Sequence, residues 1–493
     1  MRSLLIALLA AALYVLAFPP VAWSPLGVLG VAVFIYAVRL AQTSGTAWMT
    51  GAVFGLAAFG GLLWFFSKLG LIAVVPLVLL HGAYFALFGR LVWALRTKSG
   101  ISGWVMTVGL WAGLELARDN FPLGGFSWGS LGYSVSNMAL LRLPARLVGT
   151  AGLGVILVAV AAALAMRRWR LGAVVVSFLL ILGWVLVGST PLVPGDPVRV
   201  AVVQGSTPCP FEHCPDERYG TYRQHLELTG SIGKGDADLV VWAEGSTGSL
   251  NADPMLVPAV AQQMGSQAVR IGAYLLAGGD RPISETEWIN ANVLFDPAGE
   301  IVGEYRKRHP VPFGEYVPAR RFFGWVEELA AVPRDMVRGA GPVVFDTTFG
   351  KIGSVISFEG AFARYSRETA AAGARVLVVA TNEASYDRTP ATDQFIGITR
   401  MRAVETGIPV IHAAVTGRSV IIQPDGELGK LTGLGTRELL VGTVIVTNHG
   451  PTPFVRFGNW LVWLTLAAAG SVFFFEKARR PPVGVAAVSG SKP

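Results

Sequence analysis

Long apolar runs fill almost all of the first 190 residues, and they constrain this chain more than any other feature of its sequence. A helix needs about 20 apolar residues to cross the roughly 30 Å hydrocarbon core of a bilayer. Runs near that length occupy 3–18, 24–41, 47–66, 70–95, 101–117, 147–166, 171–189 and 457–475. The sequence therefore predicts a polytopic α-helical membrane domain over 1–190 with about seven spans, and a last transmembrane helix at 457–475.

Residues 196–450 read like an ordinary soluble protein, which implies a second environment. Short β-branched runs alternate there with segments that suit a helix, an alternation typical of layered α/β domains. The predicted strands are 198–203, 239–242, 269–274, 291–295, 343–345, 352–356, 376–379 and 410–414, and the predicted helices are 216–231, 254–266 and 390–406. We expect a linker at 189–196 and a tail at 476–493.

Basic residues at the ends of the apolar runs predict the orientation of the chain. With the N-terminus inside, Arg2, Arg39, Arg96 and the basic clusters at 167–170 and 477–480 all become cytoplasmic, as the positive-inside rule requires. The short outer turns are nearly free of basic residues, and only the 118–146 loop, with Arg118, Arg142 and Arg146, goes against the rule. Both termini are thus expected in the cytoplasm and 196–450 outside it, and topology explains much of the net charge of +8 without nucleic-acid binding.

The chain contains two cysteines, Cys209 and Cys214, in one loop-like stretch. A small local disulfide is compatible with an oxidising compartment. A zinc site needs more ligands, and the nearby His213 and His225 do not complete a standard spacing. We expect neither a metal nor a cofactor.

Three residues that can carry chemistry each lie at or just after a strand-like run: Glu244, Lys307 and Ser357. A carboxylate can act as a base, an ammonium can stabilise an oxyanion, and a small hydroxyl side chain can attack a carbonyl carbon. The combination is typical of acyl transfer, although such strand-end residues are more often solvated surface.

Several motifs in this order resemble those of the bacterial apolipoprotein N-acyltransferases, members of the carbon–nitrogen hydrolase (nitrilase) superfamily. The resemblance covers almost the whole chain and rests on Val203-Gln204-Gly205, Trp242-Ala243-Glu244, Tyr305-Arg306-Lys307-Arg308-His309 with 311–318, and Thr381-Asn382-Glu383-Ala384-Ser385 with 400–405. It implies about eight transmembrane helices in the bacterial cell membrane and an inserted αββα sandwich. It also implies transfer of an acyl chain from a phospholipid to the N-terminal amine of a diacylglyceryl-cysteine lipoprotein.

The same resemblance implies a role for each residue of the site. Glu244 would be the general base and Lys307 the oxyanion stabiliser, with Glu315 and Glu359 as supporting carboxylates. Phe358 and Asn382 would support the site as well. The implied partners are a phospholipid acyl donor, a lipoprotein N-terminus and the membrane.

This chain departs from the family pattern at the nucleophile, because the family's cysteine is replaced in Ser357-Phe358-Glu359. A serine hydroxyl is far less acidic than a thiol, and amines attack an oxygen ester more slowly than a thioester. Three interpretations remain: a working serine, a paralogue that kept lipid or lipoprotein binding or a scaffolding role but lost transfer, or an engineered substitution. Cys209 or Cys214 standing in as nucleophile is a remote fourth.

The segment 381–385 around Asn382, here called the asparagine loop, also departs from the family pattern, at Glu383 and Ser385. This departure puts the fit of the substrate in question. A nitrilase-type amidase acting on soluble substrates would leave seven preceding spans unexplained. Transport is disfavoured because the spans hold few ionisable residues.

Overall fold

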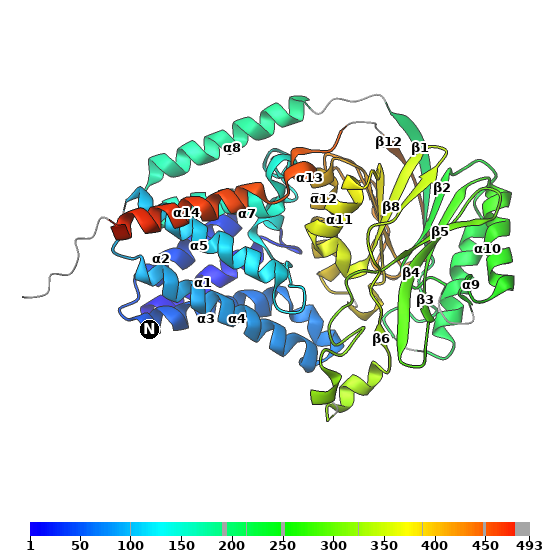
Figure 1. The fold of residues 1–493 in the computed structure, drawn as a ribbon, viewed down its shortest axis with the longest axis horizontal. Helices are drawn as coiled ribbons and strands as arrows, with labels where there is room; N and C mark the ends of the chain where they lie inside the picture. The colour runs from blue at the N-terminus through cyan, green and yellow to red at the C-terminus, as the bar shows by residue number, and fades with distance from the viewer. Residues whose placement is uncertain are drawn as a thin grey trace, which may run out of the picture.

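The computed structural model describes residues 1–98, 100–189, 195–212, 214–247, 252–323, 325–386, 388–446 and 450–478. A helical domain and an α/β domain lie side by side along the longest axis, and the last helix runs back along the helical domain (Figure 1). Most of the predicted linker (190–194) and most of the predicted tail (479–493) lie outside the described residues.

The helical domain follows the apolar runs closely. Its elements are α1 (Arg2–Leu16), α2 (Pro25–Arg39), α3 (Ser44–Leu62), the 3-10 helix η1 (Trp64–Leu69), α4 (Leu71–Ala94), α5 (Ile101–Asn120), η2 (Leu131–Val135), α6 (Ala139–Arg142), α7 (Ala145–Ala165), α8 (Trp169–Ser189), α13 (Pro453–Phe457) and α14 (Trp460–Ala478). Among the described residues, five helices are long and apolar enough to cross a membrane: α3, α4, α7, most of α8, and α14. The predicted total of about eight spans stays a prediction.

The helices differ in how much of their surface the protein covers. The most apolar stretch of 18 residues in each helix shows this difference. In α7, 78% of this stretch is buried inside the protein, whereas only 17% is buried in α8 and 6% in α14. The exposed side chains of α8 and α14 include Phe178, Trp184, Leu464 and Phe474. Exposed apolar faces of this size on helices of this length require a hydrocarbon environment, so the chain is a membrane protein.

The α/β domain begins with β1 and ends with β12. Its elements are β1 (Asp196–Gln204), α9 (Glu217–Gly230), β2 (Leu239–Trp242), α10 (Pro258–Ile271), β3 (Tyr274–Pro282), β4 (Glu287–Phe295), β5 (Ile301–Arg306), η4 (Arg320–Phe322), η5 (Glu327–Ala331), β6 (Asp335–Met336), β7 (Val344–Thr347), β8 (Gly350–Ile356), η6 (Ser357–Ala361), α11 (Ala363–Ala371), β9 (Val376–Thr381), η7 (Ala384–Tyr386), α12 (Ala391–Thr406), β10 (Val410–Ala414), β11 (Val420–Ile422) and β12 (Glu438–Val446).

The strands form two sheets. The first has the order β12-β1-β2-β3-β4-β5, with the short β6 paired to β4, and the second has the order β11-β10-β9-β8-β7. β1, β2 and β3 are parallel, as are β8, β9 and β10. The carboxyl ends of the parallel strands therefore lie at one edge of each sheet, where an active site can form.

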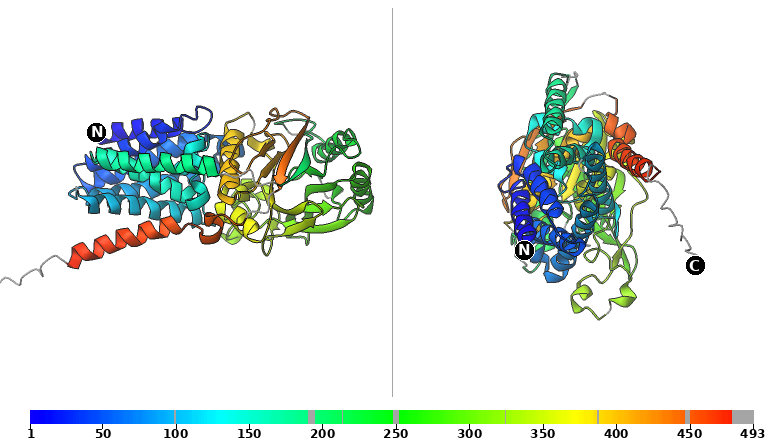
Figure 2. Two further views of the ribbon diagram at one scale, coloured as in Figure 1. Left: turned by 90° about the horizontal axis from the view of Figure 1, so that it is seen from above. Right: turned by 90° about the vertical axis from the view of Figure 1, so that its left-hand side faces the viewer.

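The two sheets pack face to face in an αββα sandwich, as predicted. Buried side chains such as Val202 and Leu276 of the first sheet share one core with Ile356 and Val378 of the second. α9 and α10 cover the outer face of the first sheet, and α11 and α12 lie between the second sheet and the helical domain (Figure 1 and Figure 2). The α/β domain therefore rests on the helical domain through its α11–α12 layer.

One strand prediction was wrong: the first half of the run 269–274 belongs to a helix, and only Tyr274 lies in a strand. α10 continues to Ile271, Gly272 caps it at a positive φ of 76°, and β3 begins only at Tyr274. Helix capping by a left-handed glycine ended the helix there, whereas the β-branched Val269 and Ile271 suggested a strand. The predicted helix 254–266 is displaced for the same reason. The predicted run 47–66 also stops early, because α3 ends at Leu62.

A buried ion pair within α12 lies at the contact between the two domains. Arg402 and Glu405 of α12 are both inaccessible to solvent and lie 3.1 Å apart, from Nε to Oε2. The other Glu405 oxygen accepts a 2.6 Å hydrogen bond from the backbone N–H of Thr150, just after a break in α7 at Gly149, whose φ is 70°. Glu405 thus caps the second part of α7, where the helix dipole favours a negative charge.

We expect Glu405→Gln to destabilise the protein by about 3–5 kcal/mol, because Arg402 would keep a buried charge without its counter-ion. Thermal or denaturant unfolding of the full chain in detergent measures the change. The control is Arg437→Gln, which breaks an exposed pair with Glu227 and should cost less than about 1 kcal/mol. Equal losses in the two variants would contradict this role for the buried pair.

Candidate active site

The three predicted site residues follow strands whose carboxyl ends share one edge of the sandwich. Glu244 follows β2, Lys307 follows β5, and Ser357 follows β8 of the second sheet. The backbone N–H of Asn382, which follows β9, donates a 2.9 Å hydrogen bond to Glu244 Oε2. This bond links the edges of the two sheets, so the sheets hold Glu244 and the nucleophile position at the same end of the domain.

Lys307 lies between two carboxylates. Its Nζ is 3.3 Å from Glu244 Oε1 and 2.5 Å from Glu315 Oε1. The Asn290 side chain donates a 2.7 Å hydrogen bond to Glu244 Oε1, and the backbone N–H of Val311 donates a 2.8 Å bond to Glu315 Oε2. Glu244 and Lys307 are buried, so hydrogen bonds and opposite charge replace the lost water.

These neighbours keep the lysine charged. Burial alone would lower the pKa of Lys307, but the Glu244 and Glu315 carboxylates outweigh it and hold that pKa well above its ordinary value. Burial raises the pKa of Glu315, and Lys307 offsets part of the increase. The site thus contains a permanent ammonium beside a carboxylate, the pair needed to stabilise an oxyanion and to accept a proton.

Ser357 occupies a sharp turn between β8 and η6. Its φ is +52°, in the left-handed region that a residue other than glycine adopts at a cost of about 1–3 kcal/mol. Unlike the strand residues before it, Ser357 is partly exposed. A strained strand-to-helix turn of this kind presents a side chain at the sheet edge, as a nucleophile requires.

The Glu359 carboxylate holds this turn against the lysine segment. Glu359 is completely buried and accepts hydrogen bonds from Tyr305 Oη (2.7 Å), Ile356 N (2.8 Å), Arg308 N (2.5 Å) and His309 N (3.0 Å). Burial raises the pKa of Glu359, although these donors stabilise its ionised form. Glu359 therefore fixes the backbone on both sides of the site.

The 118–146 loop of the helical domain contacts the turn that carries Ser357 directly. The Ser127 and Tyr133 hydroxyls both donate to the carbonyl oxygen of Ala361, at 2.9 and 3.1 Å. The Phe126 ring lies 5.7 Å from that of Phe358, between centroids. Phe358 therefore belongs to a contact between the two domains, and the helical domain holds the turn through these hydrogen bonds and this ring contact.

The asparagine loop is held by a second buried pair. Asn382 Oδ1 accepts a hydrogen bond from Ala384 N at 3.1 Å, and Glu383 Oε1 lies 3.3 Å from His412 Nε2 in β10. Both members of the pair are buried. The acidic residue that departs from the family pattern is therefore part of the scaffold behind Asn382.

Sequence reasoning missed Asn290. It stands with Asn292 in the otherwise apolar stretch of β4, and Asn292 Nδ2 donates a 2.7 Å hydrogen bond to Ser354 Oγ of the facing sheet. Because buried amides require partners, two asparagines in a buried strand are a signal that could have been used.

The structure joins the two cysteines, Cys209 and Cys214, in a disulfide. They are the only cysteines of the chain, so neither can stand in for Ser357 as a nucleophile while the disulfide is intact. Among the described residues, no group of three His, Cys, Asp or Glu side chains could hold a metal.

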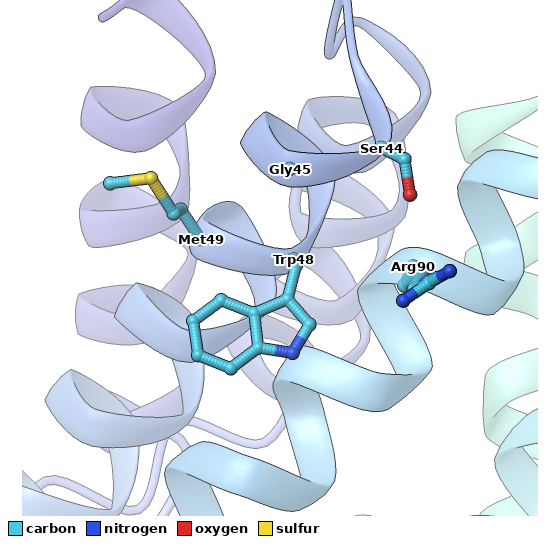
Figure 3. A pocket seen from close by; sticks show the side chains of 5 residues that line it. All are labelled: Ser44, Gly45, Trp48, Met49 and Arg90. Carbon is cyan, nitrogen blue, oxygen red and sulfur yellow. The ribbon is translucent and has the colours of Figure 1, made fainter.

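A surface hollow of about 480 Å³ lies elsewhere, between the start of α3 and the end of α4 (Figure 3). Trp48, Met49 and Arg90 line it together with Ser44 and Gly45. α3 runs from this region toward the α/β domain, where the Leu62 carbonyl accepts a hydrogen bond from Gln394. The hollow is thus at the opposite end of the helical domain from Glu244 and plays no part in the site.

Because the nucleophile position has a positive φ, we expect Ser357→Gly to be more stable than Ser357→Ala by about 1 kcal/mol. At an ordinary strand position the order is reversed, since glycine loses more backbone entropy on folding. Unfolding of both variants in detergent tests this expectation. Greater stability of the alanine variant would mean that the turn is not strained.

Comparisons with known proteins agree with this architecture. Residues 10–163 match the model of the apolipoprotein N-acyltransferase N-terminal domain, and 199–452 match the carbon-nitrogen hydrolase model. The chain is 31% identical to apolipoprotein N-acyltransferase of Geobacter metallireducens (96% of this chain, 94% of the relative) and 30% identical to that of Methylococcus capsulatus (93% of each). Among solved structures it matches an amidase from Nesterenkonia sp. at 21% identity and a TM-score of 0.40, over 54% of this chain and 96% of that one. The chain belongs to the apolipoprotein N-acyltransferase family.

Proposed function

We propose that this chain transfers an acyl chain from a phospholipid to the N-terminal amine of diacylglyceryl-cysteine lipoproteins, with Ser357 as the nucleophile. One observation carries the proposal: Lys307 is held as a cation between Glu244 and Glu315, at the sheet edge where the Ser357 turn also ends. The names of the relatives support the choice of donor and acceptor.

In the first half-reaction, Glu244 accepts the hydroxyl proton of Ser357 as Oγ attacks an ester carbonyl of the phospholipid. Lys307 stabilises the negative charge that develops on the carbonyl oxygen. The carbon–oxygen bond to the glycerol breaks, the proton passes to that oxygen, and a lysophospholipid leaves. The acyl chain is then bound to Ser357 as an oxygen ester.

In the second half-reaction, the neutral α-amine of the acceptor attacks that ester. Glu244 accepts a proton from the attacking nitrogen and returns it to Ser357 Oγ as the ester bond breaks. The products are an amide and the free hydroxyl. Phe358, Glu315, Glu359 and Asn382 keep the reacting groups in place through the contacts described above.

Serine makes both half-reactions slower than cysteine would. A hydroxyl depends on a base at hydrogen-bond distance, and among the described residues no hydrogen bond joins Ser357 to Glu244. This observation favours a second candidate function, an inactive paralogue that binds lipid or lipoprotein, or acts as a scaffold. In both cases the α/β domain at 196–450 uses the same edge.

We propose further that both termini are cytoplasmic and that the α/β domain faces the other side of the bacterial cell membrane. The Arg39 side chain donates to the Arg96 carbonyl, and Lys98 forms an ion pair with Glu476 near the end of α14. Charged residues predicted to be cytoplasmic thus gather at one end of the helices. The Cys209–Cys214 disulfide suits an oxidising compartment on the opposite side.

The proposal is tested by mass spectrometry of a lipoprotein N-terminus in cells that lack other N-acyltransferases and carry this chain or its Ser357→Cys variant. We expect triacylated lipoprotein with this chain and at least about tenfold faster formation with the cysteine variant. Lys307→Met in the cysteine background should reduce the rate by a factor on the order of 10²–10³.

Product from the cysteine variant alone would mean that the site is complete except for its nucleophile, which favours the inactive paralogue. Product from neither, with both proteins present in the membrane, would contradict acyl transfer and leave a binding or scaffolding role.

A further inference from the structure

Two buried oxygen atoms beside Glu244 have no hydrogen-bond partner. Asp280 of β3 faces Asn290 of β4 in the antiparallel register, so both side chains lie on the same face of the sheet. Asp280 Oδ1 and Asn290 Oδ1 are excluded from solvent, and neither has a partner among the described residues. Asn290 itself is 97% buried, being 3% exposed. Buried acceptors without donors are costly, so this pair calls for a ligand that donates hydrogen bonds.

The two oxygens lie on the catalytic face. Gly278 shares that face two residues earlier, and a Cβ there would be 2.6 Å from Asn292 Oδ1 and 3.1 Å from Glu244 Cα. The amide nitrogen of Asn290 is already used, because it donates to Glu244 Oε1 at 2.7 Å. Only its oxygen remains free. Whatever binds the two oxygens is therefore held directly beside the proposed base.

Two cations near this pair, Arg281 and Lys307, form ion pairs with other carboxylates. Arg281, the next residue of β3, points to the opposite face and pairs with Glu304 and Asp253. Lys307 is held by Glu244 and Glu315. Burial and the Glu244 charge raise the pKa of Asp280 to about 7, and the charges of Arg218 and Lys307 offset only part of the increase.

We propose that Asp280 and Asn290 form the site that binds the α-amino group of the acceptor, which arrives as an ammonium and loses one proton to water before it attacks the ester. The proposal rests on the function proposed above and adds the residues that recognise the amine. An ammonium supplies several N–H donors and one positive charge, which match an amide oxygen and a carboxylate. A phosphate supplies acceptors and negative charge rather than N–H donors, so it does not match these two oxygens.

The test compares two fluorescent peptides that begin with diacylglyceryl-cysteine, one with a free α-amine and the other N-acetylated. Their affinities for the full chain in detergent are measured by fluorescence anisotropy, without phospholipid. We expect the free amine to bind at least about tenfold more tightly, since a buried charge-assisted contact contributes about 1.5–3 kcal/mol. Asp280→Asn should remove this preference. The control Asp346→Asn, which changes an exposed carboxylate, should keep it.

Equal binding of the two peptides to the parent chain would overturn the proposal without any variant, so misfolding of Asp280→Asn cannot hide a failure. A preference for the free amine that survives in a folded Asp280→Asn protein would also overturn it. Turnover plays no part in this measurement. A chain that forms no acyl-enzyme with phospholipid would contradict the proposed transfer but not the ammonium site.

Discussion

The geometry of the site depends on one buried carboxylate, that of Glu359. Four donors converge on it, two of them the backbone N–H groups of Arg308 and His309 and one the N–H of Ile356. A turn with a positive φ persists only when its surroundings hold it, and Glu359 connects that turn to the segment that carries Lys307. Without this carboxylate the Ser357 turn would lose its connection to the segment that carries Lys307.

A second constraint comes from the helical domain. Ala361, at the end of the same turn, accepts hydrogen bonds from Ser127 and Tyr133, and Trp128 Nε1 donates a 2.6 Å bond to Gln394 of α12. The 118–146 loop of the helical domain therefore forms part of the scaffold of the site.

The sequence predicted what depends on local pattern. Long apolar runs predicted the helices, and β-branched runs predicted strands such as β1, β8 and β9. The boundary between α10 and β3 was mispredicted because the capping by Gly272 outweighed the preferences of its neighbours. The two asparagines in a buried strand were a signal for Asn290, whereas Asp280 could not be assigned because its importance depends on the pairing of β3 with β4.

The desolvation free energy of the buried charged cluster bears on whether a site with serine at position 357 is still in use. Burying Lys307 with two carboxylates costs desolvation free energy that well-packed apolar side chains would avoid, so such a cluster contributes little to stability by itself. A scaffold or a simple anchor gains nothing from it. A protein that must stabilise an oxyanion, or bind the charged parts of its substrates, does gain from it. The intact cluster of Glu244, Lys307 and Glu315 therefore favours a site that still meets its substrates, whatever rate the Ser357 hydroxyl permits.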